Sequence, residues 1–105
     1  MYQIRFTLTA VNLLREISDK RIQKKLIEAV EDLQAEPEKK GKALAAELEG
    51  YCSTRAVGQR YRIVYRIDDE LTTVFIVALG IRKAGANDDI YEIAKKLIRQ
   101  GLLEA

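Results

Sequence analysis

Residues 74–81 constrain the fold more than any other part of the chain, because they are apolar at nearly every position. Such a run is typical of a strand that is buried on both faces or central in a sheet. The run ends at Gly80 and Ile81, so the next residue, Arg82, should emerge at the carboxyl end of the strand. We therefore expect a sheet built around this segment.

Three other segments are expected to add strands to the same sheet. Residues 2–8 alternate between apolar and polar side chains, which indicates a half-buried strand. Residues 51–57 and 60–67 predict two further strands, which precede the strand of the apolar run, residues 72–81; turns at residues 58–59 and 68–70 join these three. Alternation in the middle strand predicts one face that packs on helices and an opposite face that is strongly cationic. The expected packed face carries Tyr61, Ile63, Tyr65 and Ile67, and the expected cationic face carries Arg60, Arg62, Val64 and Arg66.

Apolar spacing predicts two helices after the first strand and one at the end of the chain. Thr9 can cap the first helix, and Ser18 and Asp19 separate it from the second. We expect Pro37 to stop the second helix, and residues 37–50 to be mostly loop with Leu44 and Leu48 as anchors. Asp88 or Asp89 can cap the last helix, which should end before Gly101. The expected fold is α+β: an N-terminal strand, a helical hairpin on one sheet face, three strands and a short helix, in one domain of residues 1–105.

Positive charge is concentrated in the second half of the chain. Residues 50–67 contain no acid, although the net charge of the whole chain is only +2. This stretch can be a solvated strand face whose arginines pair with acids elsewhere, or a surface that binds a polyanion. Its arginines are Arg55, Arg60, Arg62 and Arg66.

Composition excludes several classes of function. The chain has no histidine, so the histidine acid–base pair of many ribonucleases is missing. The single cysteine, Cys52, is expected to be a small, partly buried residue. No carboxylates stand at metal-ligand spacing, so we expect neither a metal nor a cofactor. No apolar run is long enough to span a membrane, and we expect a cytoplasmic protein.

Several segments together resemble the RelE/ParE superfamily of toxins from bacterial type II toxin–antitoxin systems. The most specific segment is Gly58 followed by residues 61–65, Tyr-Arg-Ile-Val-Tyr. A second is residues 80–83, Gly-Ile-Arg-Lys, with Asp-Ile-Tyr at residues 89–91. The resemblance implies a curved antiparallel sheet backed by two N-terminal helices. It also implies a toxin that cuts messenger RNA in the ribosomal A site.

The resemblance also assigns site residues. It places the family's two phosphate-contacting arginines at Arg62 and Arg82, and its C-terminal tyrosine at Tyr91. Arg55 falls on one of two lysine positions of the family, whereas Ser53 occupies the other, so one cation is missing there. We expect the guanidinium groups of Arg62 and Arg82 to converge, without neutralising acids, where a phosphate could lie. Further RNA contacts are expected from Arg55, Arg60, Arg66 and Lys83.

The implied partners are a cognate antitoxin and mRNA on the ribosome, with promoter DNA contacted only through the antitoxin complex. Two alternatives remain open from the sequence. One is a ParE-like inhibitor of DNA gyrase, which the departure at Ser53 keeps in consideration. The other is a non-catalytic module that binds an antitoxin and serves as a co-repressor.

Overall fold

The structure is a computed structural model that describes residues 1–101, and it is built around a five-stranded sheet in the order β1-β5-β4-β3-β2. The apolar strand β5 lies between β1 and β4, as its sequence predicted. The β1–β5 pair is parallel and the other three pairs are antiparallel, so the sheet is mixed rather than wholly antiparallel. The strands are β1 (Gln3–Phe6), β2 (Lys42–Ala43), β3 (Cys52–Ala56), β4 (Tyr61–Asp68) and β5 (Thr73–Ile81).

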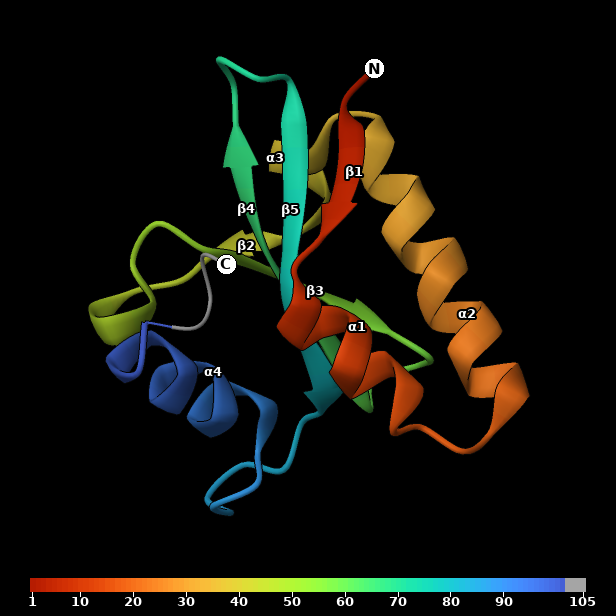
Figure 1. Cartoon of the computed structure of the whole chain (residues 1–105), viewed down its shortest axis with the longest axis vertical. Helices are drawn as coiled ribbons and strands as arrows, with labels where there is room; N and C mark the ends of the chain where they lie inside the picture. Colours follow the sequence, from red (N-terminus) through yellow and green to blue (C-terminus); the bar gives the residue numbers. More distant parts are fainter. Residues whose placement is uncertain (102–105) are drawn as a thin grey trace.

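Helices cover both faces of the sheet, as Figure 1 shows. The helices α1 (Leu8–Arg15) and α2 (Lys20–Glu31) form the predicted hairpin and pack on one face. The last helix, α4 (Ile90–Arg99), packs on the opposite face. The predicted α+β class and order of elements are confirmed.

Each face of the sheet has its own apolar core. The core under α1 and α2 includes Tyr61 and Tyr65, which were predicted to be core residues. The smaller core under α4 includes Val64 and Ile90, both fully buried. A register shift next to Val64 and Tyr65 leaves Val77 as an extra residue in β5, so that Val77 and Ala78 both contribute to the smaller core.

The face of β4 that was predicted to be strongly cationic is interrupted in the structure by α4. Strand β4 does alternate as expected, with Tyr61, Ile63 and Tyr65 in the larger core. On the other face, however, Val64 is covered by α4, because an apolar residue between two arginines gives that helix a place to pack. Arg62 and Arg66 are therefore separated, and Arg60 lies in the turn before the strand.

Two expectations about the helices also need correction. Thr7 rather than Thr9 caps α1: its hydroxyl accepts a hydrogen bond from the Ala10 amide and contacts the Ile76 carbonyl at 3.1 Å. That contact with β5 is available only to the threonine next to the sheet. Pro37 does not simply stop α2, which ends at Glu31 and is followed by the 3-10 turn η1 (Asp32–Gln34). Instead Pro37 starts the short helix α3 (Pro37–Lys40), since its fixed φ suits the first turn of a helix.

The segment expected to be mostly loop contains real structure. After α3, strand β2 extends the sheet at its edge, and the turn η2 (Ala46–Leu48) follows. Leu48 is buried and Leu44 packs against the smaller core, so both predicted anchors are confirmed. Cys52 is half-buried, as expected, and burial raises the pKa of its thiol. None of the helices in residues 1–101 is long and apolar enough to cross a membrane.

Candidate functional site

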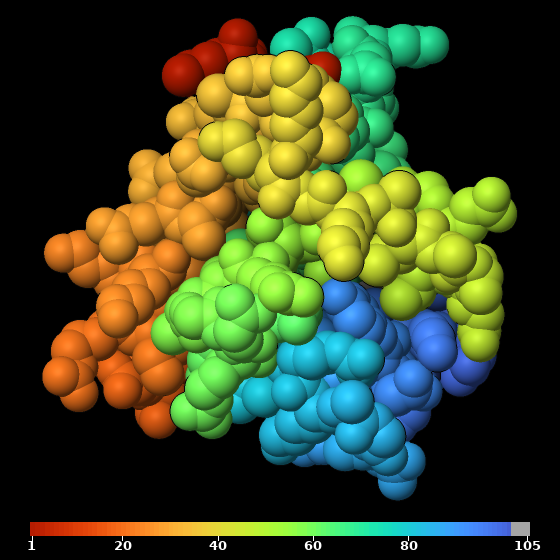
Figure 2. Space-filling view, turned by 180° about the vertical axis from the view of Figure 1, so that it is seen from behind, coloured from red at the N-terminus to blue at the C-terminus, as the bar shows by residue number. Residues whose placement is uncertain are grey.

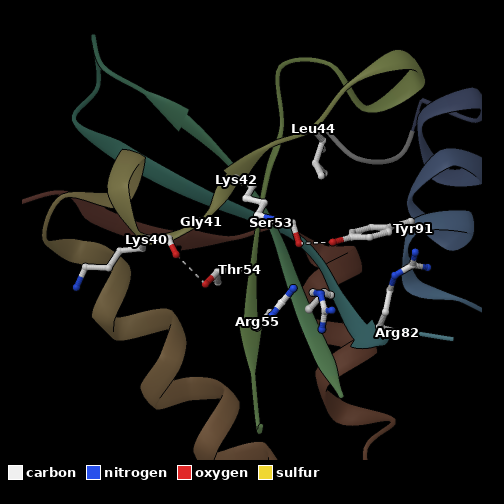
Figure 3. Close-up of a pocket in the computed structure, with 10 residues that line it drawn as sticks. Lys40, Gly41, Lys42, Leu44, Ser53, Thr54, Arg55, Arg82 and Tyr91 are labelled. Carbon is white, nitrogen blue, oxygen red and sulfur yellow. Dashed lines mark hydrogen bonds between the residues drawn. The ribbon is translucent and has the colours of Figure 1, made fainter. Parts of the chain in front are cut away.

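A cavity of about 440 Å³ opens on the face of the sheet that carries α4. In Figure 2 the segment after α3, the strands β3 and β4 and the start of α4 meet on this face. Figure 3 shows the side chains that surround the cavity. They come from five separate parts of the chain: Lys40, Gly41, Lys42, Leu44, Ser53, Thr54, Arg55, Arg62, Arg82 and Tyr91.

Two arginines on neighbouring strands form one wall of this cavity. Arg55 of β3 and Arg62 of β4 are directly opposed in the antiparallel register, so their side chains lie on the same face. Arg55 donates a hydrogen bond to the Gln59 side chain at 2.7 Å, and Arg62 donates to the Gln59 carbonyl at 2.7 Å. Neither has an acidic partner among residues 1–101. Both positive charges are therefore available to an anion.

Arg82 differs from this pair because it has an internal counter-ion. Its guanidinium lies 2.6 Å from the Asp89 carboxylate, which is only 1% exposed. The expectation that Arg82 would be free of neutralising acids is therefore wrong. The sequence could not show this, because Asp89 reaches Arg82 only through the turn before α4. Arg82 remains one-third exposed and still lines the cavity.

Asp89 positions both Arg82 and Tyr91. It caps α4 by accepting a hydrogen bond from the Tyr91 amide at 3.1 Å, and it also accepts one from the Lys83 amide. Burial raises the pKa of Asp89, but the hydrogen bond from Arg82 and those from the two amides outweigh burial, so the pKa lies below its usual value. The same hydrogen bond raises the pKa of Arg82. Asp89 is thus held as a carboxylate.

Tyr91 faces the cavity from the first turn of α4 (Figure 3). Its ring stacks on the Arg82 guanidinium, whose central carbon lies 4.6 Å from the ring centroid. Its hydroxyl is 2.7 Å from the Ser53 hydroxyl, and either oxygen can be the donor. Ser53 is buried, so this hydrogen bond fixes the end of the phenol above β3. The position of the expected lysine is therefore occupied by a partner for Tyr91.

The edge strand β2 is held against the site by close backbone packing. A Cβ atom at Gly41 would lie 2.4 Å from the Ser53 carbonyl oxygen and 2.6 Å from the Tyr65 hydroxyl, so only glycine fits there. Tyr65 donates a hydrogen bond to the Pro37 carbonyl at 2.8 Å, and Thr54 donates to the Lys40 carbonyl at 3.2 Å. Burial raises the pKa of Tyr65 to about 12, so it stays a donor. These contacts bring Lys40 and Lys42 to the cavity.

Three residues predicted to contact RNA lie outside the cavity. Arg66 stacks on Phe75 and lies 3.8 Å from Asp68. It is therefore paired with an acid, as expected if the strand face is merely solvated and does not bind a polyanion. Lys83 forms an ion pair with Asp88 at 2.8 Å. Arg60 is exposed in the turn before β4. The structure brings together Arg55, Arg62, Arg82 and Tyr91, but not these three.

Three residues of the site were not predicted from the sequence: Lys40, Lys42 and the positioning residue Asp89. Asp89 was recognised only as a helix cap. The glycine at position 41, between two lysines, is the feature of the sequence that indicates a close backbone approach at this point. Among the residues described, 1–101, no cluster of three acidic or cysteine side chains could hold a metal ion.

Comparison with known proteins gives the family. The family of the ParE toxin of type II toxin–antitoxin system, parDE, matches residues 4–85. This chain belongs to the RelE/ParE family of type II toxins. Toxin RelG of Mycobacterium tuberculosis is 41% identical over 81 residues, which are 77% of this chain and 91% of RelG. The resemblance inferred from residues 58–65 and 80–91 is therefore confirmed.

Solved structures of toxins are similar in fold to this chain. A chain of the toxin–antitoxin complex RelBE2 from M. tuberculosis is 43% identical, with a TM-score of 0.70, and the match covers 77% of this chain and 91% of that one. The isolated RelE toxin of E. coli has a TM-score of 0.67 over 97% of this chain and 100% of its own, and at 17% identity it shows the shared fold. The family match ends at residue 85, so Asp89 and Tyr91 are placed by the structure alone.

Proposed function

We propose that this toxin is a metal-independent endoribonuclease that cuts mRNA in the ribosomal A site and thereby stops translation in the cytoplasm. The observation that carries the proposal is the cavity wall formed by Arg55 and Arg62, with Arg82 and the Tyr91 hydroxyl opposite. Guanidinium groups bind phosphate through paired hydrogen bonds. Among residues 1–101, no acidic side chain lines the cavity to repel a phosphate.

The same groups suit cleavage by the neighbouring 2′-hydroxyl of RNA. In that reaction the 2′-hydroxyl gives up its proton as its oxygen bonds to phosphorus to form a 2′,3′-cyclic phosphate. The bond to the 5′-oxygen breaks and that oxygen takes up a proton, while negative charge grows on the phosphoryl oxygens in the transition state. Arg62 and Arg55 would stabilise that charge from the sheet, and Arg82 from the end of β5. The Tyr91 hydroxyl, fixed by Ser53, would orient the 2′-hydroxyl and accept its hydrogen bond.

Arginine transfers protons poorly because its pKa exceeds ~12, and the chain has no histidine. Such a site depends on a substrate held in line for attack, and positioning can contribute about 7–11 kcal/mol. A ribosome that presents mRNA in its A site would supply this positioning. Ribosome dependence therefore fits the weak acid–base chemistry of the cavity.

The test is toeprinting of mRNA on stalled ribosomes with the wild-type protein and Arg62→Ala. We expect discrete cuts within the A-site codon for the wild type and their loss in the variant. The matched control is Arg60→Ala, which removes an exposed arginine two residues away and should cut normally. Intact transcripts with the wild-type protein would overturn the proposal.

A second candidate follows from the family match, which carries the ParE name. It is inhibition of DNA gyrase, and a supercoiling assay without ribosomes tests it directly. If the protein affects neither translation nor supercoiling and leaves growth unchanged, the remaining function is a non-catalytic module.

We also propose a cognate antitoxin as partner, because the similar chain from M. tuberculosis was crystallised within a toxin–antitoxin complex. Promoter DNA would be contacted only through that complex. Co-expression of this chain with a candidate antitoxin should restore growth and give a stable complex on purification.

A further inference from the structure

Lys42 lines the cavity, but its ammonium group has no part in the cleavage reaction proposed above. Lys42 lies on β2, directly opposite Ser53 of β3 in the antiparallel register. Opposed residues of antiparallel strands have side chains on the same face, with Cβ atoms about 4.5–5.5 Å apart. Lys42 therefore lies beside Ser53, and both line the cavity, as Figure 3 shows.

Lys42 has no counter-ion in the part of the chain that the structure describes, residues 1–101. Its neighbour Lys40 forms an ion pair with Asp32 at 3.0 Å, whereas no carboxylate of residues 1–101 pairs with Lys42. The Lys42 side chain is exposed and is not part of the larger core, so it has no role in packing that core. An unpaired ammonium on a surface that already holds two unpaired guanidiniums increases repulsion in the folded protein. A bound anion would relieve that repulsion.

The position of Lys42 matches the place where the site lacks charge. Arg55 and Arg62 supply one side of the cavity, while the Ser53–Tyr91 hydrogen bond on the other side carries no formal charge. Lys42 is next to that hydrogen bond, opposite Ser53, and is a cation without an ion-pair partner among the described residues. Close packing at Gly41 holds β2 there, so the location of Lys42 is set by the backbone.

We propose that Lys42 contacts an RNA phosphate beside the Ser53–Tyr91 pair and supplies, from the neighbouring strand, the positive charge that Ser53 does not. This inference rests on the proposed RNA-binding function and adds a substrate-contacting residue to it. Lys42 acts through its charge, so another cation of similar reach can replace it, and a neutral side chain cannot.

The first experiment measures binding of a short single-stranded RNA whose 2′-hydroxyls are methylated, so that it cannot be cut by 2′-attack. Binding is measured by fluorescence anisotropy as a function of salt. We expect Lys42→Ala to reduce the slope of log K against log salt by about 0.7, the value for one lost phosphate contact on a single strand. Lys42→Arg should keep the wild-type slope. The matched control is Lys39→Ala, which removes an exposed lysine of α3 that pairs with Glu36 and does not line the cavity.

The second experiment measures cleavage on programmed ribosomes with the same variants. Lys42→Ala should cut at least about 10-fold more slowly, and Lys42→Arg should recover most of the rate. An unchanged thermal midpoint in Lys42→Ala would show that the loss is not structural. A wild-type salt slope in Lys42→Ala, or a Lys42→Arg variant as impaired as Lys42→Ala, overturns the inference. A wild-type protein that binds the RNA but cuts nothing overturns the proposed nuclease instead, and one that does neither overturns both.

Discussion

Arg55 and Arg62 are directly opposed on adjacent antiparallel strands, and neither forms an ion pair with an acid of residues 1–101. Like charges in opposed positions destabilise a sheet. A bound anion would offset the repulsion between the two guanidinium groups, so such a pair on the wall of a cavity is typical of an anion-binding site. The pair is therefore a stronger indication of function than the overall charge of +2.

Removal of one member of this pair should make the protein more stable and less active. We expect Arg55→Gln to raise the free energy of unfolding by about 0.2–1 kcal/mol, because the repulsion with Arg62 is lost. Cleavage on programmed ribosomes should fall in the same variant. Urea unfolding and a cleavage assay measure the two effects, and Arg60→Gln serves as the control with neither change. A loss of stability in Arg55→Gln would contradict the interpretation of the pair as a strained functional wall.

The hydroxyl of Tyr91 can be tested separately from its ring. Tyr91→Phe keeps the ring that stacks on Arg82 but loses the hydrogen bond to Ser53. We expect cleavage to fall by about 10²-fold or more, and stability by only about 1 kcal/mol. Ser53→Ala removes the same hydrogen bond while keeping the phenol, and should lose less activity. Equal losses in the two variants would show that the hydrogen bond rather than the phenol matters.

The Asp89 carboxylate should make stability depend on pH in the acid range. Its pKa is below the unfolded value near 3.9, so its contribution is complete above about pH 4–5 and is lost as pH falls through the folded pKa. Asp89→Asn keeps an oxygen for capping but not the charge, and should cost about 1–3 kcal/mol at pH 7. The difference in unfolding free energy between wild type and Asp89→Asn should therefore shrink below about pH 4. A difference that stays constant down to about pH 2 would argue against this role.

A single added methyl group at Gly41 should disturb the site through the backbone. In Gly41→Ala the new Cβ would overlap the Ser53 carbonyl and the Tyr65 hydroxyl, so β2 must move away from β3. We expect a loss of about 1–3 kcal/mol in unfolding free energy, together with slower cleavage. Ala43→Ser, on the exposed part of the same strand, is the control and should change neither measurement. A Gly41→Ala variant with wild-type stability would show that β2 is not held as closely as described.

The main strands could be predicted because their patterns reflect local burial. The apolar run of β5 marked an interior strand of the sheet, and alternation in β4 identified Tyr61, Ile63 and Tyr65 as core residues. Asp89 was a recognisable helix cap, since an aspartate before an apolar periodic segment is a local signal.

The features that were missed depend on contacts between distant segments. Strand β2 has only the two residues Lys42 and Ala43, which is too short for any periodicity. Which of two threonines caps α1 was decided by contact of Thr7 with β5. The sequence also did not reveal that α4 would pack on the arginine face, which determines which cations share a cavity with Tyr91.

The double role of Asp89 has a consequence for control of this toxin. Asp89, which holds Arg82, is the N-cap of α4, and the helix carries Tyr91 in its first turn. Undocking this one helix would withdraw the phenol, free Arg82 from its counter-ion and uncover the apolar surface around Val64. A partner that competes for that surface could thus switch the protein off without reaching the arginines of the sheet.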